Sequence, residues 1–132
     1  MRVVPIRLTP GTDLRLGLEQ VLQEQKEQAG WVLSGIGSLS VAPLRLAGQE
    51  ELTVLEGDLE ILTLAGSLSP DGGHLHISVA DNQGRVSGGH LAVGATVRTT
   101  AEVLVALLPA WSLLRLVDPS TGYTELIIRD QA

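Results

Sequence analysis

The chain has 132 residues, a length that predicts a single domain over residues 1–132 with a real buried core. It has no cysteine, which excludes disulfides and thiolate metal sites, and its net charge of −6 with one lysine disfavours a basic patch for nucleic acid. A charged-then-apolar leader is absent, and no apolar run reaches the roughly 18 residues that cross a bilayer, so we expect a soluble, cytoplasmic protein with no membrane partner.

The first thirty residues predict one strand and one helix. Apolar residues alternate in "RVVPIRL" (2–8), which is typical of a strand. The sequence "TPGTD" then breaks the strand, and Thr12 or Asp13 can cap a helix that extends to about Ala29. Leucine and valine recur at three-four spacing within this segment, and Gly30 suits the position after the helix.

The remainder of the chain reads as short strands. Segments rich in Val, Ile, Leu and Thr are separated by Gly, Pro, Asn and Asp at hairpin-like intervals. The pattern predicts an α+β fold, in which one N-terminal helix packs on a mostly antiparallel, strongly twisted β-sheet. "TTAEVLVALLP" (99–109) has two interpretations, because Thr99 and Glu102 fit a capping box whereas the β-branched content fits a strand.

All three histidines lie in "GGHLHISVADNQGRVSGGH" (72–90). His74 and His76 are two residues apart, so a strand would project them from one face. The residues 82–84, Asn-Gln-Gly, fit a three-residue hairpin loop whose glycine is left-handed. That loop places His76 opposite His90, with His74 in reach, whereas a two- or four-residue loop would turn His90 to the other face. The alternative is three polar side chains on a half-exposed sheet.

Three convergent imidazoles would form a metal site. They leave a tetrahedral ion one open position, as in catalytic or exchangeable sites, and Zn²⁺ is the leading candidate among divalent transition metals. Catalysis would also need a proton carrier. Glu60 in "LEILTL" and Glu102 in "TAEVL" are acids within apolar segments, where burial would raise the pKa of a carboxyl group. A capping box for Glu102 and a structural hydrogen bond for Glu60 are the competing roles.

Six motifs follow one another along nearly the whole chain: "RLTPGTDL" (7–14), "SGIGSLSVAPLRL" (34–46), "EGDLEILTLAGSLS" (56–69), "HLHISVAD" (74–81), "GRVSGGHLAVGATV" (84–97) and "TAEV" (100–103). In this order they resemble the plants-and-prokaryotes-conserved (PPC) domain, which follows the AT-hooks of plant nuclear proteins and occurs alone in bacteria and archaea. "GDLEIL" stands where the plant domains carry Gly-Arg-Phe-Glu-Ile-Leu, so Asp58 and Leu59 depart from that hexapeptide.

This resemblance implies a homotrimer and a metal site. It implies that His74, His76 and His90 correspond to the metal-site histidines of prokaryotic members. It also implies a fold similar to that of acetolactate decarboxylase, whose zinc is held by three histidines. Trimerisation suits "EVLVALL" (102–108), which has more apolar residues than one face of a sheet can bury.

Three functions follow as hypotheses. The favoured one is a homotrimeric ligand-binding or regulatory module that accepts a small molecule at the open metal position. The second is a metal-dependent lyase-like enzyme, of zinc lyase or hydrolase type, acting on a small oxo-acid. The third is a DNA-associated protein, although the AT-hook motif Gly-Arg-Pro is absent and the charge is acidic. We favour the non-enzymatic function because the sequence supplies metal ligands without convincing acid–base residues.

Overall fold

The computed structural model describes residues 1–131 and confirms the α+β fold class. Every strand pair is antiparallel. Within the described residues, no helix combines the length and the apolar character needed to cross a membrane. The elements in chain order are β1 (Arg2–Leu8), α1 (Leu14–Glu24), β2 (Gly30–Arg45), β3 (Thr53–Ser69), β4 (Gly72–Ala80), β5 (Val86–Leu91), β6 (Thr96–Leu107), β7 (Trp111–Val117) and β8 (Thr124–Asp130).

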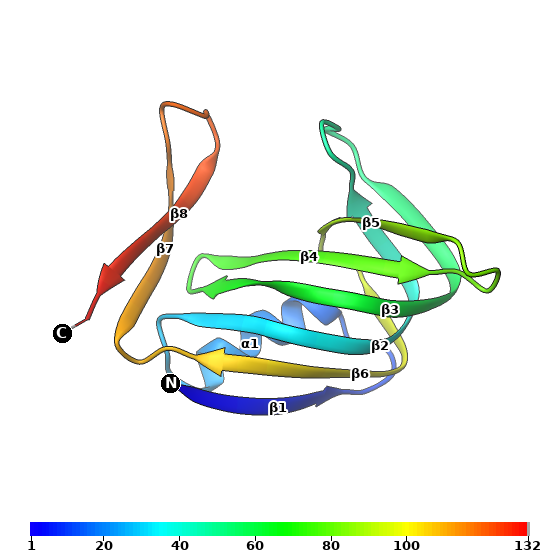
Figure 1. Cartoon of the computed structure of the whole chain (residues 1–132), viewed down its shortest axis with the longest axis horizontal. Helices are drawn as coiled ribbons and strands as arrows, with labels where there is room; N and C mark the ends of the chain where they lie inside the picture. The colour runs from blue at the N-terminus through cyan, green and yellow to red at the C-terminus, as the bar shows by residue number, and fades with distance from the viewer. Residues whose placement is uncertain (132) are drawn as a thin grey trace.

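Six strands form one sheet in the order β1-β6-β2-β3-β4-β5. The sheet curls so far that β5 also pairs with the end of β2, where Leu44 lies opposite Leu91 and Arg45 lies opposite His90. The strands β2, β3, β4 and β5 therefore form a closed ring of pairings. The β7–β8 hairpin is a separate two-stranded sheet that stands away from the main sheet (Figure 1).

The core lies between the inner face of the sheet and α1. Leu14, Leu18 and Leu22 of α1 are buried together with alternate residues of the strands. The chain has no phenylalanine, so Leu, Val, Ile and Ala fill the core. Because strand residues alternate between faces, the other face of the sheet carries the outward-pointing side chains, which include both polar residues and exposed apolar ones such as Trp31 and Ile36.

The helix begins where the sequence predicts and ends earlier. Asp13 is the N-cap, and its side chain accepts a hydrogen bond from the Leu16 N–H at 3.0 Å. The helix ends at Glu24 and not near Ala29, and Lys26 takes a left-handed φ of 57°. Gly30 is not the residue after the helix. It is the first residue of β2 and pairs with β3 and β6, so the intervening residues carry the chain from helix to sheet.

The ambiguous segment at 99–109 is a strand through Leu107. It forms the C-terminal half of β6, which lies between β1 and β2 and pairs with both. The capping-box interpretation of Thr99 and Glu102 is therefore wrong. Pairing on both sides outweighs a local preference for a helix start, and the buried residues Ala101, Val103 and Val105 show strand alternation.

The β4–β5 turn confirms the predicted three-residue loop. Gly84 is left-handed, with φ 79°, and its N–H donates to the Asp81 carbonyl at 3.0 Å. The Asp81 N–H donates to the Arg85 carbonyl at 2.9 Å, which closes the loop. The resulting register places His76 opposite His90, as expected. Backbone N–H groups of Arg85 and Gln83 donate to the Asp81 carboxylate and hold its pKa below the usual value.

Two glycines with positive φ predict different losses of stability. Gly84 has φ 79° with open space around an added Cβ, whereas Gly66 has φ 148° and its added Cβ would lie 2.0 Å from the His74 carbonyl oxygen. Gly84→Ala should lower the free energy of unfolding by about 1 kcal/mol, through backbone strain alone. Gly66→Ala should lower it by at least about 3 kcal/mol, because a clash adds to the strain. Urea denaturation measures both, and equal losses would contradict this account.

Candidate metal centre

The three histidines meet on the face of the sheet that points away from the core. His74 and His76 alternate along β4 with buried residues such as Leu75 and Ile77, so both imidazoles point outward. The register of β5 brings His90 to the same face. The ring centroid of His74 lies 5.1 Å from that of His76 and 5.1 Å from that of His90. The ring centroids of His76 and His90 are 6.0 Å apart.

The cluster has the donor set and the spacing of a metal site. One ligand nitrogen from each histidine lies within 4.8 Å of the others. A tetrahedral ion with bonds of about 2.0–2.1 Å would hold these nitrogens about 3.3 Å apart. Small rotations of the side chains can bring the nitrogens that much closer. His76 is exposed and His90 is half-buried, so the rings have room to rotate. The three histidines could therefore hold a metal ion.

The environment keeps two of the imidazoles neutral, the form that binds a metal. Burial lowers the pKa of His90 to about 4, and the positive charge of Arg45 adds to this effect. Burial also lowers the pKa of His74, and Arg115 contributes in the same direction. The ligand nitrogens of both side chains are consequently free of competing protons at neutral pH.

The histidines lie on the floor of an open groove of about 1150 Å³. Residues 45–50, at the end of β2 and in the loop that follows it, form one side of the groove. Its floor comes from β3, β4 and β5, and its other side comes from the β7–β8 hairpin. In Figure 1 this hairpin and the β2–β3 hairpin rise on either side of β4. The groove is thus assembled from segments that are far apart in the sequence.

Three of the eight arginines in the chain line this groove, and sequence reasoning missed them. Arg15, on α1, donates to Glu19 at 3.0 Å and to the Leu91 carbonyl at 3.1 Å. Arg115, on β7, donates from Nη2 to Ser67 Oγ at 2.8 Å. Arg45 is the register partner of His90. Scattered in the sequence, these residues carry no local pattern that would have identified them.

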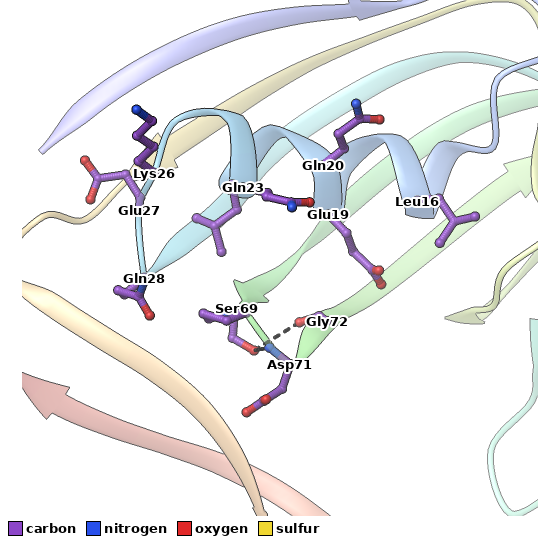
Figure 2. A pocket seen from close by; sticks show the side chains of 12 residues that line it. Leu16, Glu19, Gln20, Gln23, Lys26, Glu27, Gln28, Ser69, Asp71 and Gly72 are labelled. Atoms are coloured by element: carbon purple, nitrogen blue, oxygen red, sulfur yellow. Dashed lines mark hydrogen bonds between the residues drawn. The ribbon is translucent and has the colours of Figure 1, made fainter.

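Glu19 joins the helix to the strand that carries two of the histidines. Its Oε1 accepts from Arg15 Nε and also from the Gly73 N–H at 3.1 Å. Figure 2 shows this side chain directed from α1 toward Gly72, the first residue of β4. Because Gly73 immediately precedes His74, the contact positions His74, one of the three histidines that could hold a metal ion, relative to α1.

The groove in Figure 2 is a different one. It has a volume of about 710 Å³ and lies between α1 and the β3–β4 turn, where Ser69 Oγ donates to the Gly72 carbonyl at 3.2 Å. Its charged lining residues are Glu19, Lys26, Glu27 and Asp71, and it contains no histidine. It therefore lacks the donor set found in the other groove.

The prediction that Glu60 and Glu102 are buried is wrong. Glu60 lies on β3 between the inward-facing Leu59 and Ile61, so its side chain is exposed on the outer face. Glu102 is exposed on β6 for the same reason. Neither residue lines the groove that contains the histidines. Both segments are apolar because one face is buried, and the acids occupy the other face.

A different carboxylate reaches the histidines. Glu125, on β8, lines the groove, and its negative charge acts to raise the pKa of His74 against the stronger lowering effects. Its sequence context, "TELIIR", resembles that of Glu60, an acid in an apolar strand. No local signal distinguishes the two, because only the tertiary position of the β7–β8 hairpin brings Glu125 to the site.

Comparison with known families and sequences gives two findings. The model of the Plants and Prokaryotes Conserved domain matches residues 1–109. The bifunctional protein GlmU of Synechococcus sp. (strain JA-3-3Ab) is 53% identical over 132 residues, which are 100% of this chain and 21% of that protein. The chain thus spans about a fifth of the length of the curated relatives it matches.

Solved structures agree with the fold over almost the whole chain. A hypothetical protein from Salmonella cholerae-suis is 39% identical, with a TM-score of 0.95 over 99% of this chain and 95% of its own. A metal-containing protein from Archaeoglobus fulgidus is 31% identical, with a TM-score of 0.81 over 96% and 94%. A candidate DNA-binding protein from Ralstonia eutropha JMP134 is 27% identical, with a TM-score of 0.77 over 95% and 90%.

The contact between Glu19 and β4 predicts a measurable contribution to stability. Glu19→Ala removes a part-buried acceptor of two hydrogen bonds and should lower the free energy of unfolding by about 2 kcal/mol. Glu24→Ala is the matched control on the same helix, because its side chain is exposed, and it should change that energy by less than about 0.5 kcal/mol. Thermal or urea denaturation compares them. Equal effects would mean that the bridge does not hold the helix against β4.

Proposed function

The chain belongs to the Plants and Prokaryotes Conserved domain family, and we propose that it is a single domain that binds one transition-metal ion and serves as a ligand-binding or regulatory module. The metal ligands are His74, His76 and His90. The open groove around them gives a small molecule access to the ion. Zn²⁺ is the first candidate because three imidazoles suit it and no thiolate is available.

The observation that carries this proposal is the convergence of three imidazole nitrogens to within 4.8 Å on one outward face. No oxygen or sulfur ligand is needed to explain the arrangement. A relative of 31% identity, from Archaeoglobus fulgidus, is described as metal-containing, which supports a metal here. Three protein ligands leave a tetrahedral ion one position for an exchangeable ligand, and this suits a binding module.

The module functions as a homotrimer in this proposal. Exposed apolar side chains cover the outer face of β1, β6, β2 and β3, including those of Trp31, Ile36 and Leu104. Trp31 lies opposite Ser67, which lies opposite His74, so the apolar surface runs up to the groove. A closed cyclic assembly would cover such a surface without open-ended growth.

A metal-dependent lyase acting on a small oxo-acid is a second candidate function. It is favoured by Glu125, a carboxylate in the groove that could carry a proton. The chain would supply three imidazoles to hold the ion, whose chemistry when bound is to polarise a carbonyl group. Turnover of a 2-oxo acid by the metal-loaded protein, lost in Glu125→Gln, distinguishes this function from binding alone.

The relationship to GlmU suggests where such a module acts. All 132 residues align with a segment of the Synechococcus protein at 53% identity, so that segment is joined covalently to the rest of GlmU. We propose that the module acts together with GlmU, in the same polypeptide or as a separate chain. The activity of GlmU, measured with and without the metal-loaded module, tests this association.

Metal content is the direct test of the proposed site. Elemental analysis of the purified protein should give about one transition-metal ion per chain, and His76→Ala should lose most of it because two imidazoles remain. Ser78→Ala is the matched control, since Ser78 lies on the same face of β4, two residues further along. It should keep the metal. Full metal content in His76→Ala would refute the ligand assignment.

Oligomeric state tests the trimer. Light scattering should give a mass of three times the 13.9 kDa of one chain. Ile36→Glu places a charge on the apolar outer face, where the Ile36 side chain is 56% exposed, and should dissociate the trimer. Leu16→Glu is the control, with 48% exposure, on α1, which packs on the opposite, core-facing side of the sheet. A monomer mass for the unchanged protein would refute the assembly.

A further inference from the structure

We propose that the groove beside the histidines binds a small organic acid, whose carboxylate is held by the guanidinium groups of Arg45 and Arg115. This inference rests on the proposed function, because it names the ligand class of the same site.

The two arginines flank the histidine cluster. Arg45 is paired in register with His90, at the side where β5 meets β2. Arg115 reaches the other side from β7, and its Nη2 donates to Ser67 Oγ, where Ser67 is the register partner of His74. A molecule bound against the imidazoles therefore lies between two guanidinium groups that come from separate parts of the chain.

Both arginines have unused donors. No hydrogen bond or ion pair of the Arg45 guanidinium is found within residues 1–131. Arg115 uses one Nη2 bond to Ser67, and its backbone N–H donates to Asp71 at 2.8 Å, so Nε and Nη1 remain available. A guanidinium fork matches the two oxygens of a carboxylate.

Arg15 has a different task. It is 22% exposed, and its bonds to Glu19 and to the Leu91 carbonyl fix it against α1 and the end of β5. Because Leu91 follows His90, these bonds hold the third histidine in place. Arg15 is therefore a positioning residue, and Arg45 and Arg115 contact the ligand.

The charged residues that line the groove favour a ligand with a single carboxylate over a polyanion. The chain carries a net charge of −6, yet three of its eight arginines line this one groove. The carboxylates Glu50, Asp71 and Glu125 line the same groove and would repel a long run of phosphates. A single carboxylate needs only the donors that Arg45 and Arg115 have left, and it brings less negative charge near these acids than a polyanion does.

Calorimetry on the metal-loaded protein tests the ligand class, with pyruvate, acetone and inorganic phosphate as probes. Pyruvate should bind, and acetone, which lacks the carboxylate, should not. Arg45→Gln and Arg115→Gln should each weaken pyruvate binding about tenfold, the effect of losing about 1.4 kcal/mol. Arg98→Gln is the matched control, because Arg98 pairs with Asp58 and does not line the groove, and it should bind pyruvate as the unchanged protein does.

The metal content of each sample separates the possible failures. Pyruvate binding of equal strength in all variants, with the metal present, overturns the arginine assignment and leaves the proposed metal site standing. If the purified protein takes up no metal and still binds pyruvate in an arginine-dependent way, the arginine assignment is supported and the metal site is refuted. Tighter binding of phosphate than of pyruvate overturns the carboxylate class. Displacement of pyruvate by a short DNA duplex, with a steep salt dependence, also overturns it.

Discussion

The parity of one turn decides what the outer face of the sheet can do. Side chains alternate along a strand, so one residue more or fewer between β4 and β5 would exchange the inward and outward sets of β5. The loop of residues 82–84 is closed by the bond between Asp81 and Arg85, and the Asp81 carboxylate accepts two further backbone N–H groups. This local network keeps His90 on the outward face, opposite His76, and the rest of the site is arranged around that pair.

Closure of the sheet turns a pair of strands into a groove. Pairing of β5 with the end of β2 brings Arg45 to His90, and the loop after β2 then forms one side of the groove. On the other side, Arg115 and Asp71 join β7 to the β3–β4 turn at 2.8 Å. Burial against these walls lowers the pKa of His74 and His90, so the fold favours the neutral form of both imidazoles, the form that could hold a metal ion.

Sequence reasoning succeeded where the determinants are local. The N-cap Asp13, the strand alternation and the turn at Gly84 act over a few residues, and each was predictable. It failed at Gly30, which starts a strand because β3 and β6 flank it. It left residues 99–109 open between a helix start and a strand, and pairing with β1 and β2 decides for the strand. Glu125 and Arg115 could not be predicted as residues of the groove, because no local sequence pattern indicates that the β7–β8 hairpin lies beside the histidines.

The boundary of the family match divides the groove into two parts. The matched segment, residues 1–109, contains the three histidines together with Arg15 and Arg45. The β7–β8 hairpin, with Arg115, Tyr123 and Glu125, lies beyond it. The strands that carry the three histidines therefore belong to the matched segment, whereas one side of the groove above them does not. A change in that hairpin, by evolution or by protein engineering, could therefore alter which molecules enter the groove and leave the three histidines on its floor unchanged.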